Sequence, residues 1–467
     1  MERVEQHVIR TLFSRAMSDM YRKEVPQYGT LLQIVDEVNT ATLAAHPELL
    51  AALKKNDDLA RINEERHGAI RLGTAAELQT MRELFAVMGM YPVGYYDLSI
   101  AGIPVHATAF RPVTDIDLKK NPFRVFTSLL RIELIDDPKI RLMAEHILAS
   151  RSIFTPRVRE LIAINADNGG LSRIQAQEFV HEALETFRWH DQATTSLEQH
   201  HILETIHPLI ADIVCFKGPH INHLTPRTLD ITAVQKKMHE LGLNPKAIIE
   251  GPPERNVPIL LRQTSFKALE EAIYFPTKQG GEVKGTHKAR FGEIEQRGIA
   301  LTPKGRALYE HLLNQVRCTI IPALDGSNAA EYYQVLHNQF LAFPDSLHEL
   351  MNQGLVYLEY HATEKGIPHA GTLANKTVNE LISDGYLEFT PIIYEDFLPI
   401  SAAGIFTSNL GDNTPHLVLT PGNQRAFEEA LGIPVQEPFD LYAMREHNSL
   451  TSALNKIGLP PTTLKTG

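Results

Sequence analysis

The sequence predicts an α+β fold, in which sheet segments are interrupted by a long helical stretch. Residues 1–60 carry apolar residues at helical spacing, and residues 137–213 return to the same pattern. Residues 91–135 and 252–298 instead contain short runs rich in β-branched and aromatic residues, which are typical of strands. With 467 residues, of which 43% are hydrophobic, the chain is long enough for two or three domains or for one large core with insertions.

Local signals place the individual elements of the first part of the chain. Thr74, with Glu77 three residues later, predicts the start of a helix. Two short strands should meet near Gly102, and a longer strand should cover residues 123–135. Within residues 252–298, two strand-like stretches flank a glycine-rich loop, and another helix follows this region.

A second mixed segment, with one helix and two strands, begins at about residue 324. We therefore predict a catalytic core over residues 1–323, with N-terminal helices and a helical insertion near residues 137–245. A C-terminal α+β part should follow over residues 324–467. The same pattern is compatible with one integrated domain, because no linker of low complexity separates the two parts.

Composition narrows the classes of function. The formal net charge is −11, whereas a nucleic-acid-binding protein usually has a basic surface, so we expect no nucleic-acid partner. Cys215 and Cys318 are isolated, which argues against a disulfide framework and against a thiolate zinc site. No apolar run approaches the roughly 18 residues of a membrane span, and the N-terminal residues lack the apolar block of a signal peptide. We expect a cytoplasmic protein with no membrane partner, whereas its oligomeric state stays open.

Three polar stretches in strand-like surroundings are candidates for a functional site. A single histidine or glutamate in a strand is most often structural, so no stretch decides the function alone. His200, His201 and His207 follow a helical pattern and are interpreted as structural, as is His287 in the glycine-rich loop. The three stretches are RHGAIRLGT (66–74), PHINHLTPRTLDI (219–231) and ARFGEIEQRG (289–298).

Strand geometry groups some of these residues. Residues two apart in a strand share a face, so His67 and Arg71 should point into one cavity. An imidazole and a guanidinium in one cavity can serve a metal and an anionic ligand together. Glu293 and Glu295 share a face with Arg297, so the alternation does not choose between the two glutamates.

Seven stretches of the sequence closely resemble the 2-oxoadipate dioxygenase/decarboxylase family, and they run through nearly the whole chain. The resemblance implies a vicinal-oxygen-chelate-like core, which is a β-sheet cup around a metal, with large helical insertions. That core is similar to the core of hydroxymandelate synthase. The stretches are RHGAIRLGT, PVGYYDLSIAGIPVHATAFRPV, FRVFTSLLRIEL, NHLTPRTLDI, LLRQTSFKALEE, ARFGEIEQRGIALTPKGR and YEDFLPISAAGIFTSNLG.

The resemblance also implies a metal held by two histidines and one glutamate. His67 matches the histidine of the family's first motif, and His223 matches that of the motif NHLTPR. The glutamate lies in FGEIEQR. We assign it to Glu293, because related dioxygenases carry their ligand four residues before the arginine of a similar E-x-x-Q-R stretch. Glu295 is the alternative to Glu293, and His220 is the alternative to His223.

Two histidines and one carboxylate leave about three coordination positions open, which suits non-haem Fe(II). We therefore expect Fe(II), although zinc or another divalent metal can occupy such a site in a purified protein. A 2-oxo acid can fill two positions and O2 the third. The resemblance implies that the enzyme converts 2-oxoadipate and O2 to D-2-hydroxyglutarate and CO2, as in bacterial lysine degradation. No separate oxo-acid co-substrate is needed, because the substrate supplies its own.

The substrate itself requires a cation for the carboxylate that does not lie on the metal. Arg71 can hold this carboxylate with a planar pair of hydrogen bonds, and a structural ion pair is the alternative role for Arg71. The resemblance adds Ile400 and Ser401, in the stretch FLPIS, as substrate contacts. Further polar candidates for the lining of the cup, without a ranking, are Ser128, Arg262 and Gln263.

Two other functions are compatible with the sequence. The same cup and metal could serve a glyoxalase-type isomerase or a hydrolase, both of which commonly use zinc. A non-catalytic metal- or ligand-binding protein is the other alternative. Iron-dependent uptake of O2 separates the dioxygenase from both.

Overall fold

The structure is a computed structural model, which describes residues 3–55, 58–323, 325–366, 373, 376–398 and 422–459. These residues form a mixed α+β protein, as the sequence predicts. The chain divides into two compact units, and each is described by itself. Unit 1 comprises Met1–Glu250, Gln263–Gln296 and Asp396–Gln436, and unit 2 comprises Gly251–Arg262, Arg297–Glu395 and Glu437–Gly467. Such compact units need not be folding domains, so the division at residue 324 stays a prediction.

The main sheet of unit 1 has five strands in the order β2-β3-β4-β1-β5. Strand β1 is parallel to β4 and antiparallel to β5, and the remaining neighbours are antiparallel. Strand β1 has a neighbour on each side, so its backbone groups are paired. The strand is also buried along nearly its whole length. The strands are β1 (Arg66–Leu72), β2 (Tyr91–Asp97), β3 (Val105–Arg111), β4 (Arg124–Leu130) and β5 (Leu224–Pro226).

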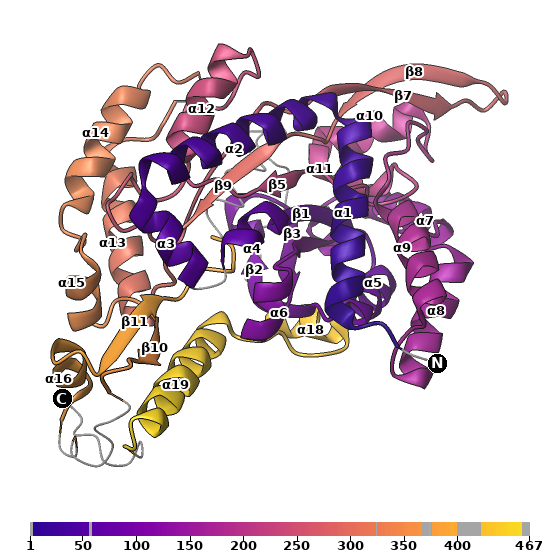
Figure 1. Ribbon diagram of the computed structural model, residues 1–467. Coiled ribbons are helices and arrows are strands. Elements are labelled where there is room, and N and C mark those ends of the chain that lie inside the picture. Colours follow the sequence, from indigo (N-terminus) through magenta and orange to yellow (C-terminus); the bar gives the residue numbers. More distant parts are fainter. Residues whose placement is uncertain are drawn as a thin grey trace. The chain divides into compact units, whose positions relative to one another are not determined.

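Helices cover the sheet of unit 1. Helix α5 begins after Thr74, whose side chain and that of Glu77 form the capping box that the sequence predicts. In Figure 1, α1, α8 and α9 lie beside α5, and α1 packs on α9 while α5 packs on α8. The longer helices are α1 (Gln6–Glu24), α2 (Pro26–Ala45), α5 (Ala75–Val87), α7 (Pro138–Ser150), α8 (Pro156–Asn168), α9 (Arg173–Phe187), α10 (Leu197–Ile206) and α12 (Ile231–Glu240); the shorter ones are α3 (Pro47–Lys55), α4 (Leu59–Glu64), α6 (Asp115–Lys120), α11 (Pro208–Val214) and α18 (Gln424–Leu431).

Strand β4 is shorter than the predicted strand over residues 123–135. It ends at Leu130, and a 3-10 turn follows at Ile132–Leu134. Arg131 N donates to Pro104 O, so the chain is held against the start of β3 where it leaves the sheet. The link between β2 and β3 confirms the predicted turn near Gly102, which has φ 78°.

The glycine-rich stretch is mostly strand rather than loop, in contrast to the prediction. Strands β7 (Glu270–Pro276) and β8 (Glu282–Lys288) form a hairpin, which is the long pair of arrows at the upper right of Figure 1. Gly280 and Gly281 lie at its turn, where Gly280 has φ 84°, whereas Gly285 lies within β8. Strand β6 (Leu261–Ser265) pairs with β9 (Glu293–Arg297), which carries the two candidate glutamates.

Unit 2 contains a two-stranded antiparallel sheet with its own apolar core. Strands β10 (Leu358–Ala362) and β11 (Leu387–Pro391) pair in antiparallel fashion, as the sequence predicts for this region. Helix α19 packs on β10, and Leu381, Leu387 and Leu454 belong to the core beneath. The helices are α13 (Pro303–Thr319), α14 (Ala329–Phe340), α15 (Leu347–Asn352), α16 (Val378–Ser383) and α19 (Pro438–Lys456).

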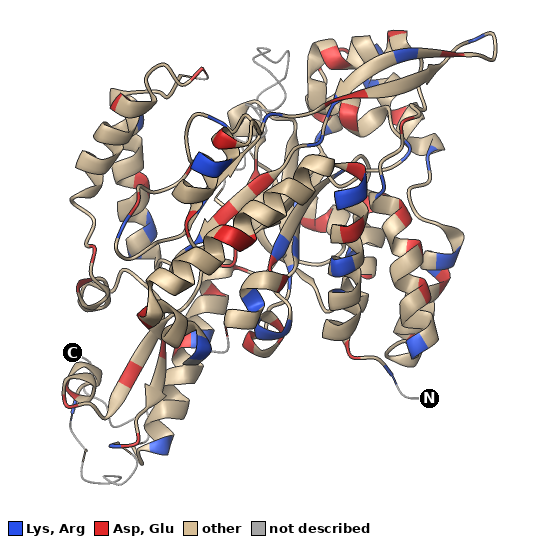
Figure 2. Ribbon diagram, turned by 45° about the horizontal axis from the view of Figure 1, so that its top comes forward, with Lys and Arg blue, Asp and Glu red and all other residues tan. Residues whose placement is uncertain are grey.

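Charged residues of both signs are distributed over the described helices. Figure 2 shows lysine and arginine interspersed with aspartate and glutamate along these helices, rather than gathered in one basic stripe. None of the described helices combines the length and the apolar character that crossing a bilayer requires.

Candidate metal centre

Strands β1 and β5 bring two histidines together. The register pairs His67 with Thr225, and His223 precedes β5 by one residue, so the rings of His67 and His223 lie 5.3 Å apart between centroids. Gly68 permits this approach. A Cβ atom at position 68 would lie 2.5 Å from Ile221 Cδ1 and 3.0 Å from His223 O. A side chain there would require the end of the Ile221 side chain to move and would crowd the His223 carbonyl group.

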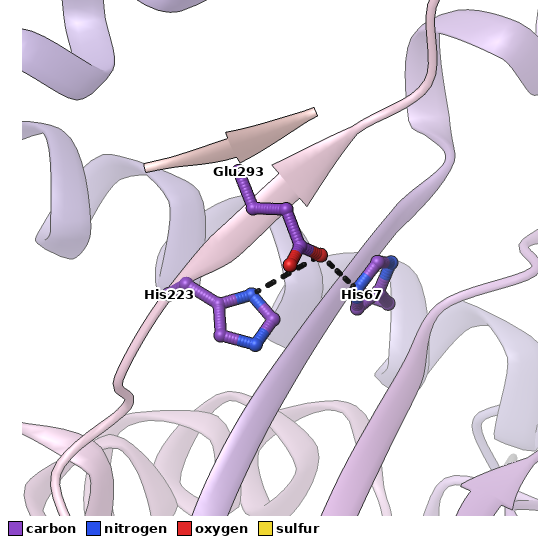
Figure 3. Close-up of side chains that lie close together, drawn as sticks. All are labelled: His67, His223 and Glu293. Atoms are coloured by element: carbon purple, nitrogen blue, oxygen red, sulfur yellow. Dashed lines mark hydrogen bonds and ion pairs between the residues drawn. The ribbon is translucent and has the colours of Figure 1, made fainter. Parts of the chain in front are cut away.

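Glu293, the first residue of β9, completes a group of three buried side chains. Its Oε1 atom lies 2.9 Å from His67 Nε2 and 3.9 Å from His223 Nδ1. Figure 3 shows the carboxylate between the two imidazoles. One ligand atom from each residue lies within 4.8 Å of the others. The structure therefore brings together the three residues that the sequence analysis selects as metal ligands.

The surroundings of Glu293 fit a divalent cation. Oε1 accepts hydrogen bonds from Thr225 Oγ1 at 3.0 Å and from Gln263 Nε2 at 3.1 Å. Across the residues that the structure describes, no donor reaches Oε2, although this atom is buried. A buried carboxylate oxygen without a partner is costly, and a cation would satisfy it. Two imidazoles and one carboxylate are also the donor set of open, substrate-binding metal sites.

Electrostatic interactions set the protonation states of the three side chains, and two of them are in the state that a metal ligand requires. Burial lowers the pKa of His67, but Glu295 and Glu293 outweigh it and leave that pKa above its usual value. Burial raises the pKa of Glu293, but His223 and His67 outweigh it and leave it below its usual value. Burial and the charges of His67 and Arg71 lower the pKa of His223 to about 4, although the charge of Glu293 acts to raise it. At neutral pH, Glu293 is therefore ionised and His223 offers a lone pair.

Glu295 occupies the other side of His67. Its Oε2 atom lies 3.2 Å from His67 Nδ1, while Glu293 meets Nε2 of the same ring. Arg124 Nη1 lies 4.0 Å from Glu295 Oε1. Imidazole ligands usually donate their second N–H to a carboxylate, which fixes the orientation of the ring. The arrangement therefore favours Glu293 on the side of the candidate metal, with Glu295 in ion-pair contact with the opposite nitrogen atom of His67, which has no hydrogen-bond partner among the described residues.

Arg71 lies in a second buried cluster on the same strand. Arg71 Nη1 donates to Asp212 Oδ2 at 2.5 Å. The other oxygen of Asp212 accepts from His287 Nε2 at 2.9 Å and lies 3.2 Å from His220 Nε2. His220, the alternative to His223, thus lies beside Asp212, whereas His223 lies beside Glu293.

The remaining predicted residues differ in where they lie. Gln263 donates to Glu293, which gives one of the unranked candidates a definite contact. Ser128 lies opposite Arg71 in the register of β1 and β4. Ile400 and Ser401 lie outside the described residues, so their role as substrate contacts stays a prediction.

Two residues of this site escaped the sequence analysis. Thr225 contacts both Glu293 and His223, yet a threonine in a strand gives no distinctive signal. The sequence does contain a signal for Asp212, because it is the single charged residue in the apolar helix PLIADIV. A charge in such a stretch indicates a buried partner.

Comparisons with known proteins decide the family. The profile of the 2-oxoadipate dioxygenase/decarboxylase family matches residues 13–409. This chain belongs to that family. A 2-oxoadipate dioxygenase/decarboxylase of Pseudomonas putida is 54% identical over 452 residues, which covers 97% of each chain. Another, from Escherichia coli, is 54% identical over 442 residues, with 94% of this chain and 96% of that protein covered.

Solved structures agree with this family assignment. The crystal structure of the hydroxyglutarate synthase from Pseudomonas putida in complex with 2-oxoadipate matches with a TM-score of 0.90 and 53% identity. The match covers 98% of this chain and 100% of that one. A second crystal structure of the hydroxyglutarate synthase from Pseudomonas putida matches with a TM-score of 0.87 and 50% identity. The resemblance that the sequence motifs indicate is therefore confirmed.

Proposed function

We propose that this family member converts 2-oxoadipate and O2 to D-2-hydroxyglutarate and CO2 with the help of Fe(II). The observation that carries the proposal is the match, over 98% of this chain, to a hydroxyglutarate synthase solved with 2-oxoadipate. The reaction balances, because one carbon leaves as CO2 and both oxygen atoms of O2 are incorporated, one in the new carboxylate and one in the hydroxyl group. The D configuration and a place in lysine degradation follow from the resemblance of the motifs.

His67, His223 and Glu293 would hold the metal in this proposal. They supply two nitrogen atoms and one carboxylate oxygen from three separate segments of unit 1. Bound Fe(II) would supply the activation of O2 and the chelation of the 2-oxo acid. The sheet segments around these residues would form the vicinal-oxygen-chelate-like cup that the resemblance implies.

The protein's own groups would orient the substrate and keep water out. His67 and His223 are covered by aromatic rings, since Phe397 lies 4.9 Å from His67 and Phe291 lies 4.8 Å from His223 between centroids. This apolar cover would exclude water from the reacting carbon atoms. Glu295 would hold the His67 ring in place.

Arg71 would bind the distal carboxylate of the diacid. It lies on the same face of β1 as His67, four residues along the strand, which is about 13 Å between Cα atoms. The positive charge of Arg71 contributes to the lowered pKa of His223. Ile400 and Ser401 would supply further contacts to the substrate.

The proposal is tested by uptake of O2. The protein is loaded with Fe(II) under anaerobic conditions and then mixed with O2 and a panel of 2-oxo acids. We expect O2 uptake and CO2 release to be fastest with 2-oxoadipate. A zinc-loaded sample serves as the control and should consume no O2. Turnover by the zinc form without O2 uptake would instead indicate an isomerase or hydrolase, an alternative that the family assignment does not favour.

A further inference from the structure

Asp212 is a buried carboxylate that the proposed reaction does not use directly. It lies on α11, where every residue from Leu209 to Val214 is buried and where it is the single charged residue. Placing a charge in such surroundings costs free energy, and a buried ion pair is often no more stable than an apolar replacement. The cost suggests that Asp212 has a task beyond stabilising the fold.

The contacts of Asp212 fix its carboxylate in space. Its Oδ2 atom accepts from Arg71 Nη1 at 2.5 Å, and its Oδ1 atom accepts from His287 Nε2 at 2.9 Å. His220 Nε2 lies a further 3.2 Å from Oδ1. Because the two oxygens are engaged by different partners, the carboxylate can neither rotate nor shift without losing a contact. Residues from three other segments thus fix the carboxylate that binds the guanidinium of Arg71.

Charge also favours this arrangement. Burial raises the pKa of Asp212, but Arg71, His220 and His287 outweigh burial and hold it well below its usual value. Asp212 is therefore ionised and compensates the charge of Arg71, which is 2% exposed. A guanidinium has five N–H donors in a planar fork, so one carboxylate can orient it while another edge serves a second carboxylate.

We infer that Asp212, held by His287, is a positioning residue that orients Arg71 for the distal carboxylate of the substrate. The inference rests on the proposed role of Arg71, and it adds a residue that does not itself touch the substrate. If the Arg71 side chain is already ordered, binding of the diacid does not carry the entropy cost of ordering that side chain. Loss of Asp212 should therefore weaken substrate binding, and it should do so only while Arg71 is present.

A double-mutant cycle tests this dependence. The Kd of 2-oxoadipate is measured by anaerobic calorimetry on the Fe(II)-loaded full chain, so that no turnover occurs. We expect Arg71→Met to weaken binding by about tenfold or more, and Asp212→Asn by about fivefold. In the protein with both substitutions, Kd should stay within about twofold of that of Arg71→Met alone, because Asp212 has nothing left to orient.

Two further variants separate positioning from a loss of stability. Glu77→Gln removes another largely buried carboxylate of unit 1, which pairs with Arg151 at 2.6 Å, and should leave Kd within about twofold of wild type. His287→Gln weakens the support of Asp212 more mildly and should raise Kd by about two- to fivefold. If Asp212→Asn does not fold, the same cycle is run with His287→Gln.

The outcomes distinguish this inference from the proposed function. If Arg71→Met bound 2-oxoadipate with the wild-type Kd, both the proposed role of Arg71 and this inference would be wrong. Weak binding by Arg71→Met together with unchanged Kd for Asp212→Asn would overturn only the inference. If the fold-increases in Kd of the two single variants multiplied in the double variant, Asp212 would act independently of Arg71. Tighter binding by Asp212→Asn would show that Asp212 competes with the substrate, which also contradicts positioning.

Discussion

The two polar clusters on strand β1 differ in how their charges are balanced. Around His67, two glutamates face the two nitrogen atoms of one imidazole, and Glu293 Oε2 has no donor among the described residues. Around Arg71, the carboxylate of Asp212 meets a guanidinium and two imidazoles. In the first cluster, Arg124 Nη1 lies 4.0 Å from Glu295 Oε1, whereas in the second Arg71 donates directly to Asp212 at 2.5 Å.

This difference indicates two tasks for one strand. Two imidazoles facing a buried carboxylate oxygen that has no hydrogen-bond donor among the described residues are suited to bind a metal ion. A cluster in which an arginine is already paired is suited to hold that arginine in one orientation. Three residues lie between His67 and Arg71, and this spacing along β1 separates the proposed reaction centre from the proposed carboxylate site. Each prediction below changes one cluster and leaves the other unchanged.

The largest effect should follow from removing a histidine of the first cluster. His67→Ala or His223→Ala leaves two ligands, which hold a divalent ion poorly, so bound metal and turnover should both be lost. Metal content is measured by atomic absorption after loading with Fe(II), beside O2 uptake. A matched control is His106→Ala, because His106 is also buried but lies on β3, where its ring contacts Tyr95 and Phe427. Near-wild-type activity in either ligand variant would remove that residue from the site.

The two glutamates around His67 should differ in effect. Glu293→Ala should abolish turnover, because it removes a ligand. Glu295→Ala should leave the ligand set intact and weaken metal affinity by about 10- to 100-fold, as expected for a group that orients a ligand. The Kd for Fe(II) of both variants is measured under anaerobic conditions. The reverse order of the two effects would move the ligand from Glu293 to Glu295.

Arg71 should affect the substrate and not the metal. A buried charge-assisted hydrogen bond contributes about 1.5–3 kcal/mol, which corresponds to about one to two decades in kcat/KM. We expect Arg71→Met to lower kcat/KM by about tenfold or more for 2-oxoadipate, and much less for 2-oxohexanoate, which lacks the distal carboxylate. Iron content should stay near that of the wild type. Equal losses for both substrates would place Arg71 at the metal-bound end of the substrate.

Gly68 should show a smaller effect that is mainly structural. The Cβ of Gly68→Ala would lie 2.5 Å from Ile221 Cδ1, so neighbouring atoms must move and stability should fall by about 1–3 kcal/mol. Gly281→Ala is the matched control, because its Cβ would meet only Thr277 Oγ1 at 3.5 Å. Urea unfolding of both variants measures the difference. Equal stability of the two variants would show that His223 does not depend on the close approach at Gly68.

Part of this site follows from the sequence, and part depends on tertiary structure. Alternation along a strand places His67 and Arg71 on one face, and the motifs select Glu293 and His223. Alternation cannot distinguish Glu293 from Glu295, because both lie on the same face of β9. Only the folded chain shows that they meet opposite nitrogen atoms of one ring.

The fold shows the same division between local and distant effects. The start of α5 is fixed by neighbours in sequence, so the capping box at Thr74 was predictable. The end of β4 depends on a hydrogen bond from Arg131 to Pro104, which lies more than 20 residues earlier. The pairing of Arg71 with Asp212 spans 141 residues, and no periodicity in the sequence connects them.

Labelling with 18O2 tests the proposed reaction most directly. The Fe(II)-loaded protein is mixed with 2-oxoadipate and labelled O2, and the 2-hydroxyglutarate formed is analysed by mass spectrometry. We predict that the product carries both labelled oxygen atoms, one in the new carboxylate and one in the hydroxyl group, and that Glu293→Ala forms no product. Unlabelled product, or product formed without O2, would contradict a dioxygenase at the centre formed by His67, His223 and Glu293.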